Sequence, residues 1–195
     1  MVERRFAKDD PLRLQVRDAA VMRALAHPAR IAILEHLFAG NSGTATELAE
    51  VSGLSPSATS YHLRALAKVD LIEDAPSRGD GRERVWQTAI RGFDIEAGPA
   101  SGAAEQAAER ELTTMFLDLE DARAREWLER RQHESQEWYE ASSFSDLRLL
   151  VTAEELKALN AEILALLLPY GLSRRSDPPP EARSVNTTYR SFPTG

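Results

Sequence analysis

Apolar side chains recur every three or four positions over most of this chain, a spacing that predicts amphipathic helices. Leu14, Val21 and Leu25 predict a first helix that stops before Pro28. Pro28 begins a second helix, which ends at Gly40. Two further short helices follow, so the N-terminal part of the chain is predicted to be mainly helical.

The third and fourth predicted helices are joined by a tight turn at Gly53. Thr44 and Glu47 have the spacing of a capping box at the start of the third helix. Ser55 and Pro56 begin the fourth helix as a hydroxyl N-cap and a proline at the first helical position. Two short helices joined in this way present the second one to the major groove of DNA.

The pattern changes after the fourth helix, where two short strands and a loop are predicted. Leu71–Asp74 and Arg84–Thr88 are expected to pair as antiparallel strands. The glycine-rich segment Ser77–Arg82 between them is expected to form a hairpin loop, or wing.

Five short motifs in this region occur in an order that is typical of one protein family. They are Leu25-Ala-His-Pro-Ala-Arg-Ile-Ala-Ile-Leu34, Glu47-Leu-Ala, Gly53-Leu-Ser, Ser60-Tyr-His-Leu63 and Leu71-Ile. The set resembles the winged helix-turn-helix of ArsR-type bacterial transcription regulators over about residues 12 to 95. The resemblance implies a dimeric, repressor-like DNA-binding protein. Asp70 departs from the family, in which glycine is common at that position, but aspartate tolerates left-handed backbone better than most residues.

A long helix is predicted from Ala103 to about Ala141, because no proline or glycine interrupts this segment. Its apolar residues repeat at alternating steps of four and three, as in a coiled coil: Ala108, Leu112, Met115, Leu119 and Ala122. We therefore expect a homodimer held through residues 103–141, with Leu112 and Leu119 in the seam.

A second capping box, Thr152 and Glu155, predicts another helix near the C-terminus. Residues 148–151 before it and 184–190 after it are candidates for short strands. The predicted fold is mainly α with a small β-wing and a few short strands. It has a winged helix-turn-helix domain over residues 12–95 and a helical dimerisation and effector region over residues 103–195.

Composition excludes several classes of protein. The chain has no cysteine, which excludes disulfides and thiolate metal sites. Its longest apolar run, Ile163–Leu168, is far too short to cross a bilayer, and the N-terminus lacks an apolar leader. We expect a cytoplasmic protein with no membrane partner.

Negative charge is concentrated in the C-terminal half of the chain. The net charge is −7, yet residues 13–95 carry ten Arg and Lys against ten Asp and Glu. Residues 96–168 carry seven against sixteen. DNA-binding domains are usually basic, so a neutral domain counts modestly against nucleic-acid binding.

The candidate DNA contacts lie on one face of the fourth helix. Ser57, Ser60, Tyr61 and Arg64 fall at i, i+3, i+4 and i+7, opposite Leu63. A guanidinium can bond guanine O6 and N7 together, so Arg64 is the preferred base contact. The two hydroxyls and the phenol can bond phosphate or base edges.

Three more residues complete the predicted DNA-binding set: His62, Arg78 and Arg82. For His62 we expect either a structural hydrogen bond or a phosphate contact. Arg78 and Arg82 belong to the wing, where glycines allow close approach to phosphate or to the minor groove. The simpler alternative for each of them is an ordinary solvated side chain.

Together these features predict a sequence-specific DNA-binding transcriptional regulator that acts as a homodimer on a palindromic operator in double-stranded DNA. The alternative is a winged-helix protein-interaction module that does not bind DNA. We expect no enzymatic activity and no cofactor, because no phosphate-binding loop or nucleophile–base pair accompanies the carboxylates.

The C-terminal half contains residues that suggest two kinds of ligand, a metal ion and an apolar small molecule. His133 and Glu137 have ligand spacing on a helix, but they lack the second histidine or cysteine that a metal site needs, so no metal is expected. Trp127, Trp138, Tyr139 and Ile163 are consistent with a pocket for an unknown apolar small-molecule effector, but ordinary core packing is the favoured interpretation of these side chains.

Overall fold

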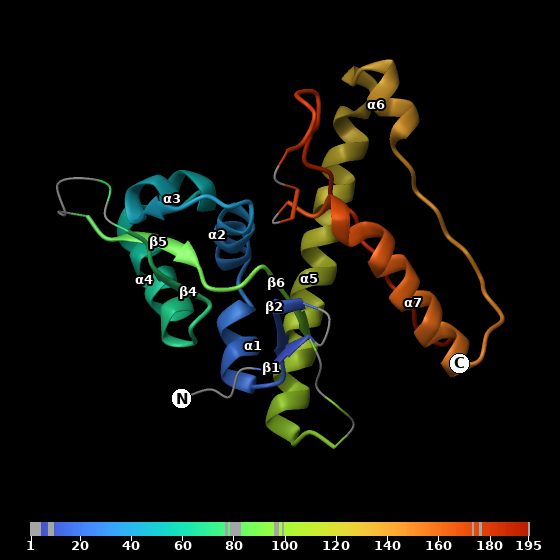
Figure 1. Ribbon diagram of the computed structural model, residues 1–195, viewed down its shortest axis with the longest axis horizontal. Helices are drawn as coiled ribbons and strands as arrows, with labels where there is room; N and C mark the ends of the chain where they lie inside the picture. Colours follow the sequence, from blue (N-terminus) through green and yellow to red (C-terminus); the bar gives the residue numbers. More distant parts are fainter. Residues whose placement is uncertain are drawn as a thin grey trace. The chain divides into compact units, whose positions relative to one another are not determined.

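The computed structural model describes residues 5–7, 10–76, 78, 83–95, 98, 100–172, 174–175 and 177–194. The chain divides into two compact units, Met1–Asp118 and Leu119–Gly195, and each is considered by itself below (Figure 1).

The first unit contains four short helices that meet around an apolar core. They are α1 (Ala19–Leu25), α2 (Pro28–Phe38), α3 (Ala45–Ser52) and α4 (Pro56–Lys68). The largest side chains that are completely buried include Met22, Leu34, Leu48, Leu63 and Leu66. These residues lie on the apolar stripes of the helices, so burial of the stripes holds the four helices together.

Leu14 does not belong to the first helix, and that part of the sequence prediction was wrong. Leu14 lies in a strand, and α1 begins only after Asp18, whose carboxylate accepts the backbone N–H of Ala20 at 2.6 Å. Leu14 and Val16 are buried while Gln15 between them is half-buried, the alternation of a strand with one covered face.

Three strands that flank the helices and the wing in the sequence form a sheet that was not predicted. Strands β1 (Arg5–Ala7), β2 (Asp10–Val16) and β6 (Gly92–Ile95) lie in the order β1-β2-β6. β2 runs antiparallel to β1 and parallel to β6. The guanidinium of Arg13 donates to both carboxylate oxygens of Asp94, at 2.8 and 2.6 Å, which fixes the register of β2 against β6.

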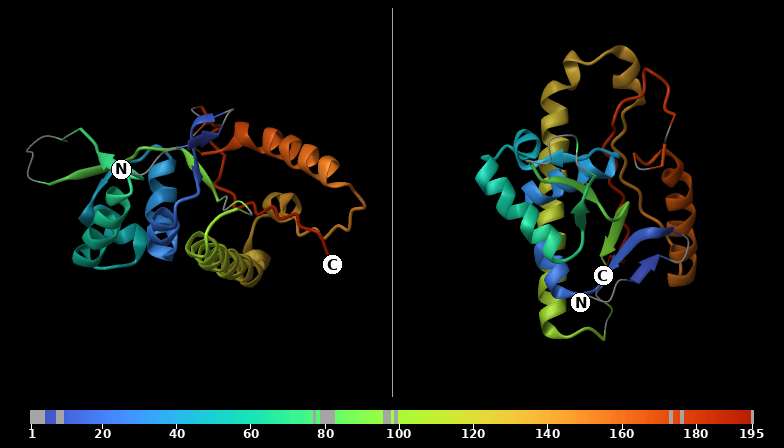
Figure 2. Two further views of the ribbon diagram at one scale, coloured as in Figure 1. Left: turned by 90° about the horizontal axis from the view of Figure 1, so that it is seen from below. Right: turned by 60° about the vertical axis from the view of Figure 1, so that its left-hand side comes forward.

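The predicted wing hairpin is present as a second sheet. Strands β3 (Gly43–Thr44), β5 (Val85–Thr88) and β4 (Ile72–Asp74) lie in the order β3-β5-β4, all antiparallel. This sheet lies beside α3 and α4 (Figures 1 and 2). Asp70, which links α4 to the first strand of the hairpin, has φ of 58°, as the sequence analysis expected.

The long helix α5 (Ala103–Arg130) starts in the first unit and ends in the second. Leu112 is completely buried within its own chain, so the expectation that it lies in an open dimer seam was wrong. The Phe116 ring contacts the Phe93 ring of β6 at a centroid distance of 5.9 Å. The first turns of α5 therefore complete the core of the winged-helix unit.

The second unit contains the rest of α5, the 3₁₀ turns η1 (Arg131–His133) and η2 (Leu168–Tyr170), and the helices α6 (Gln136–Ala141) and α7 (Ala153–Leu167). The capping box of Thr152 and Glu155 is confirmed at the start of α7. Residues 148–151 and 184–190 are extended but pair with no other strand that the structure describes, so both strand predictions were wrong for the single chain. No helix among the described residues combines the length and apolar character needed to span a bilayer.

Polar contacts from the C-terminal tail tie this unit together. Asn186 and Thr188 both donate to the carboxylate of Glu120 on α5. Tyr189 and Ser191 both donate to the Asn160 side-chain oxygen on α7, at 2.9 Å. The tail therefore connects α5 to α7.

Candidate nucleic-acid interface

The turn between α3 and α4 has the geometry that the sequence predicted. Gly53 adopts left-handed backbone with φ of 68°, which a residue without a Cβ adopts at little cost. The Ser55 hydroxyl accepts the N–H of Ala58 at 3.3 Å, and Pro56 occupies the first turn of α4. At α3 both bonds of the predicted capping box are present. Local capping thus sets where α4 begins and which face it exposes.

The exposed face of α4 carries three of the predicted contacts. Ser57, Tyr61 and Arg64 are exposed, and 63% of Tyr61 is accessible to solvent. Arg64 makes no hydrogen bond or ion pair with any residue that the structure describes. Ser60 is half-buried and its hydroxyl donates to the Pro56 carbonyl at 2.9 Å, which leaves its oxygen lone pairs for a ligand.

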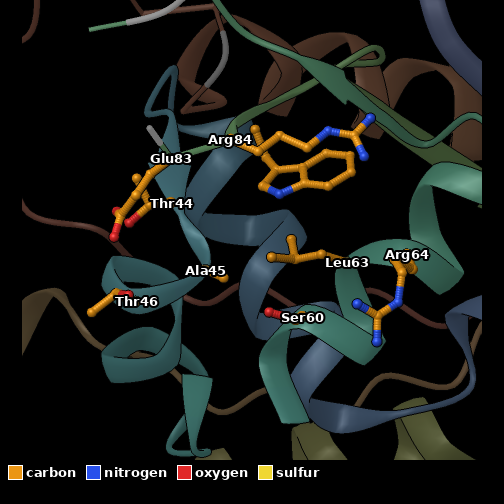
Figure 3. A pocket seen from close by; sticks show the side chains of 9 residues that line it. Thr44, Ala45, Thr46, Ser60, Leu63, Arg64, Glu83 and Arg84 are labelled. Carbon is orange, nitrogen blue, oxygen red and sulfur yellow. The ribbon is translucent and has the colours of Figure 1, made fainter. Parts of the chain in front are cut away.

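A groove of about 300 Å³ separates α4 from the base of the wing. Ser60, Leu63 and Arg64 form one side of it, and Arg84 and Trp86 of the hairpin form another (Figure 3). Thr44, Ala45 and Thr46 at the start of α3, and Glu83 beside Arg84, complete the lining. The groove brings two guanidiniums, a carboxylate, three hydroxyls and the apolar side chains of Leu63 and Trp86 to the same surface.

Arg84 is a site residue that the sequence analysis did not select. Its guanidinium lies 3.9 Å above the centre of the Trp86 ring and forms a two-bond pair with the Asp74 carboxylate across the hairpin. The pairing lowers the pKa of Asp74 and raises that of Arg84. Trp86 is 4% exposed and packs in the core. Successive side chains of a strand point to opposite faces, so the sequence Arg84-Val-Trp86 at the start of a predicted strand could have indicated that Val85 is buried and Arg84 lies on the other face.

Arg78, one of the two predicted wing contacts, already has partners within the chain. Arg78 donates to the Glu47 carboxylate at 3.1 and 3.3 Å, and to the carbonyl and hydroxyl of Ser42. Its charge is therefore partly compensated at the start of α3. Arg82, the other predicted wing contact, lies outside the described residues.

His62 is not on the exposed face of α4. It is 8% exposed, and its ring lies 4.3 Å from the ring of His27, the N-cap of α2. The His27 Nδ1 atom accepts the N–H of Ala29 at 3.1 Å and so caps the first turn of α2. His62 therefore packs α4 onto α2, and direct contact with DNA would require it to leave that position.

The two imidazoles lie in a cationic environment. Burial lowers the pKa of His62, and His27 and Arg30 lower it further. Burial also lowers the pKa of His27, with a second contribution from Arg30. The Arg30 Nε and His62 Nδ1 atoms are buried without a hydrogen-bond partner among the described residues.

The aromatic residues considered for an effector pocket each pair with an arginine of their own unit. Guanidinium groups lie over the rings of Trp127, Trp138 and Tyr139 at 5.3, 4.7 and 4.6 Å, and come from Arg130, Arg183 and Arg131. Arg183 also forms a two-bond pair with Glu134 and lowers the pKa of that carboxyl to about 2. Among the described residues no three metal-binding side chains gather.

Comparison with known proteins points to the same segment of the chain. A family model described as a helix-turn-helix domain matches residues 25–75. The HTH-type transcriptional regulator YgaV of Escherichia coli is 45% identical over 56 residues, which are 28% of this chain and 56% of that protein. The match therefore spans little more than half of the relative's length.

Two solved structures align over a longer stretch at low similarity. One is a mutant of Lactococcus lactis ZitR in apo form, with 20% identity, a TM-score of 0.31, and coverage of 74% of this chain and 83% of the other. The other is the adhesin competence repressor AdcR of Streptococcus pyogenes, with 14% identity, a TM-score of 0.32, and coverage of 72% and 78%. The geometry of the two helices and the matched domain model together identify residues 25–75 as a helix-turn-helix domain.

Proposed function

We propose that this chain is a sequence-specific DNA-binding transcriptional regulator that acts as a homodimer on a palindromic operator. The observation that supports it best is the exposed face of α4, where Arg64 projects beside the groove between α4 and the wing. Helix-turn-helix proteins place the second helix of the motif in the major groove. We propose no catalytic role.

The side chains on this face have the chemistry that base recognition needs. The Arg64 guanidinium has the fork geometry that bonds guanine O6 and N7 together. Tyr61 is an exposed aromatic residue, and its ring can pack on a thymine methyl while its hydroxyl bonds phosphate. Ser57, in the first turn of α4, is placed for phosphate or a base edge.

Two copies are part of the proposal because one short helix contacts too few base pairs for useful specificity. A two-fold dimer contacts two half-sites about 34 Å apart, which makes the operator palindromic. The curated relative is named as a transcriptional regulator, which agrees with this assignment for the matched segment.

The alternative is a winged-helix module that binds a protein. One observation favours it: Arg78 and Arg84, the wing arginines that the structure describes, are both paired with carboxylates. Together with the neutral charge of residues 13–95, this pairing leaves little uncompensated positive charge for phosphates. Interface cores, however, favour aromatic residues and methionine, and Ser57 and Arg64 on the exposed face are neither.

Selection of bound sequences from random duplex DNA tests the proposal. The full chain should enrich an inverted repeat whose half-sites are centred about 10 base pairs apart. Arg64→Ala should weaken the enrichment and relax it at one base pair of each half-site, and Arg110→Ala, which removes the same charge from α5, should leave it intact. No enrichment by the unmodified chain would contradict DNA binding and favour the protein-interaction module.

A further inference from the structure

The second unit lacks a hydrophobic core of its own. No side chain among its described residues is buried, and the last buried residue that the structure describes is Leu112 of the first unit. Polar contacts from the tail hold α5 and α7 together, but net stability from hydrogen bonds between exposed groups is small. A unit of this kind needs further apolar burial to be stable.

The last turns of α7 show where that burial is missing. Ile163–Leu168 is a run of six apolar residues, so it covers every side of the helix. A helix that is apolar all round is normally buried on all sides. Here Leu164, Leu166 and Leu167 are 44%, 72% and 41% exposed.

The extended stretch that joins α6 to α7 has the same property (Figure 1). Leu147, Leu149 and Leu150 are 77%, 55% and 103% exposed. Its backbone pairs with no other strand that the structure describes. Most large exposed apolar residues of the described chain lie in this stretch, in α7 and in the segments that follow it.

The accessible area of the chain indicates how much surface remains to be covered. The chain exposes 13519 Å². A compact monomer of this mass exposes roughly 9,200 Å², and two separate compact bodies sharing the mass expose roughly 11,100 Å² in total. The chain therefore exposes roughly 2,400 Å² more than even the larger value, and a large obligate dimer interface covers a comparable area on each partner.

We propose that these two segments, Leu147–Val151 and Ile163–Leu168, together form the surface on which a second copy of this chain docks. We call it the apolar surface. Each copy then supplies the core that the other copy's second unit lacks. The inference rests on the proposed function, in which two copies act on one operator, and it places the pairing outside residues 103–141.

The charges on α7 favour a protein partner over a lipid surface. Its polar positions include Glu154, Glu155 and Glu162 against a single basic residue, Lys157. Amphipathic helices that lie on membranes carry Lys and Arg on the polar face, because the lipid headgroups there are anionic. An acidic helix would be repelled.

Size-exclusion chromatography with light scattering, at micromolar concentration and without DNA, tests the apolar surface. The unmodified chain should elute at twice its monomer mass of 21.7 kDa. Leu150→Glu and Leu166→Glu should each elute as monomers, because each places an unpaired charge in the interface. Both leucines lie outside the first unit, which has its own core, so the monomeric variants should keep the helical circular dichroism of that unit and lose part of the signal from the second unit.

Leu128→Glu is the matched control, because Leu128 is a 48% exposed leucine of the same unit on α5. It should stay dimeric. A monomeric unmodified chain would overturn the proposal, and so would dimers that survive Leu150→Glu and Leu166→Glu but dissociate with Leu128→Glu. Selection of DNA by a monomeric chain would overturn the apolar surface alone and leave DNA binding in place.

Discussion

The His62 ring of α4 lies against the His27 ring at the N-cap of α2, with the ring centroids 4.3 Å apart. Among the described residues, the charged group that acts on this pair is Arg30, and the Tyr61 ring contacts the His62 ring. His27 can accept the Ala29 N–H only while its Nδ1 atom is unprotonated. The junction between α2 and the proposed recognition helix therefore depends on neutral imidazoles.

Stability should consequently fall as the solution becomes mildly acidic. Both histidines have a folded-state pKa below the ordinary value of 6.5, so below that pH the unfolded chain binds protons that the folded chain does not. The contribution of the pair is complete above pH 6.5 and is lost as the pH falls from there through the folded pKa values. Urea unfolding at about pH 7.5 and about pH 5.5 measures it.

His62→Gln is the control for this effect, because glutamine fills a similar space and does not titrate. The variant should show a smaller decrease in stability between the two pH values. The carboxyls with lowered pKa values, such as Glu47 and Asp74, act only below about pH 4.5 and do not overlap this window. Equal decreases in the variant and the unmodified chain would contradict the assignment.

Gly53→Ala should destabilise the helix-turn-helix through backbone strain alone. A Cβ at Gly53 would meet no heavy atom within 4 Å, but φ of 68° is costly for alanine. The expected loss is about 1–2 kcal/mol in thermal or urea unfolding. Gly53→Asn should lose less, since asparagine tolerates left-handed backbone, and an equal loss for both variants would indicate a steric cause instead.

Leu112→Ala should destabilise the winged-helix unit without changing its association. Leu112 is completely buried in its own chain, so its truncation should cost about 2–5 kcal/mol in unfolding. Leu117→Ala, at a 40% exposed position on the same helix, should cost far less. If the dimer dissociates on Leu112→Ala while the monomer keeps its stability, Leu112 contacts the partner copy and the original seam prediction is right.

Salt dependence should be moderate, because few uncompensated cations face the proposed operator. Three or four neutralised phosphates per subunit predict a slope of log K against log salt of about −5 to −7 for the dimer. Fluorescence anisotropy across a salt series measures the slope. A value near −10 or steeper would mean that residues outside the described part of the wing, or the chain's termini, contribute many more contacts.

The sequence was sufficient for the helix-turn-helix because its determinants are local. Gly53, Ser55 and the capping box of Thr44 and Glu47 act within a few residues of their own positions, and the structure has all of them. The sheet formed by β1, β2 and β6 was missed, because its pairing joins Leu14 to Phe93, far apart in sequence. The alternation in Leu14-Gln-Val16 was the available indication.

The candidate site was only partly predictable, for a similar reason. Helical spacing placed Ser57, Tyr61 and Arg64 on one exposed face. The same spacing could not show that His62 turns inward onto α2, or that Arg78 reaches Glu47 across 31 residues. These contacts depend on tertiary packing, which a single helix period does not contain.

The most direct test of the central claim measures how tightly the Arg64→Ala variant and the unmodified chain bind the selected operator. Each protein is also measured on operators that carry a single-base change in one half-site. The variant should lose about 1–3 kcal/mol of binding free energy, and its preference should relax at one base pair only. A loss that is equal on every DNA sequence would place Arg64 on the phosphate backbone. No loss at all would contradict α4 as the surface that contacts bases.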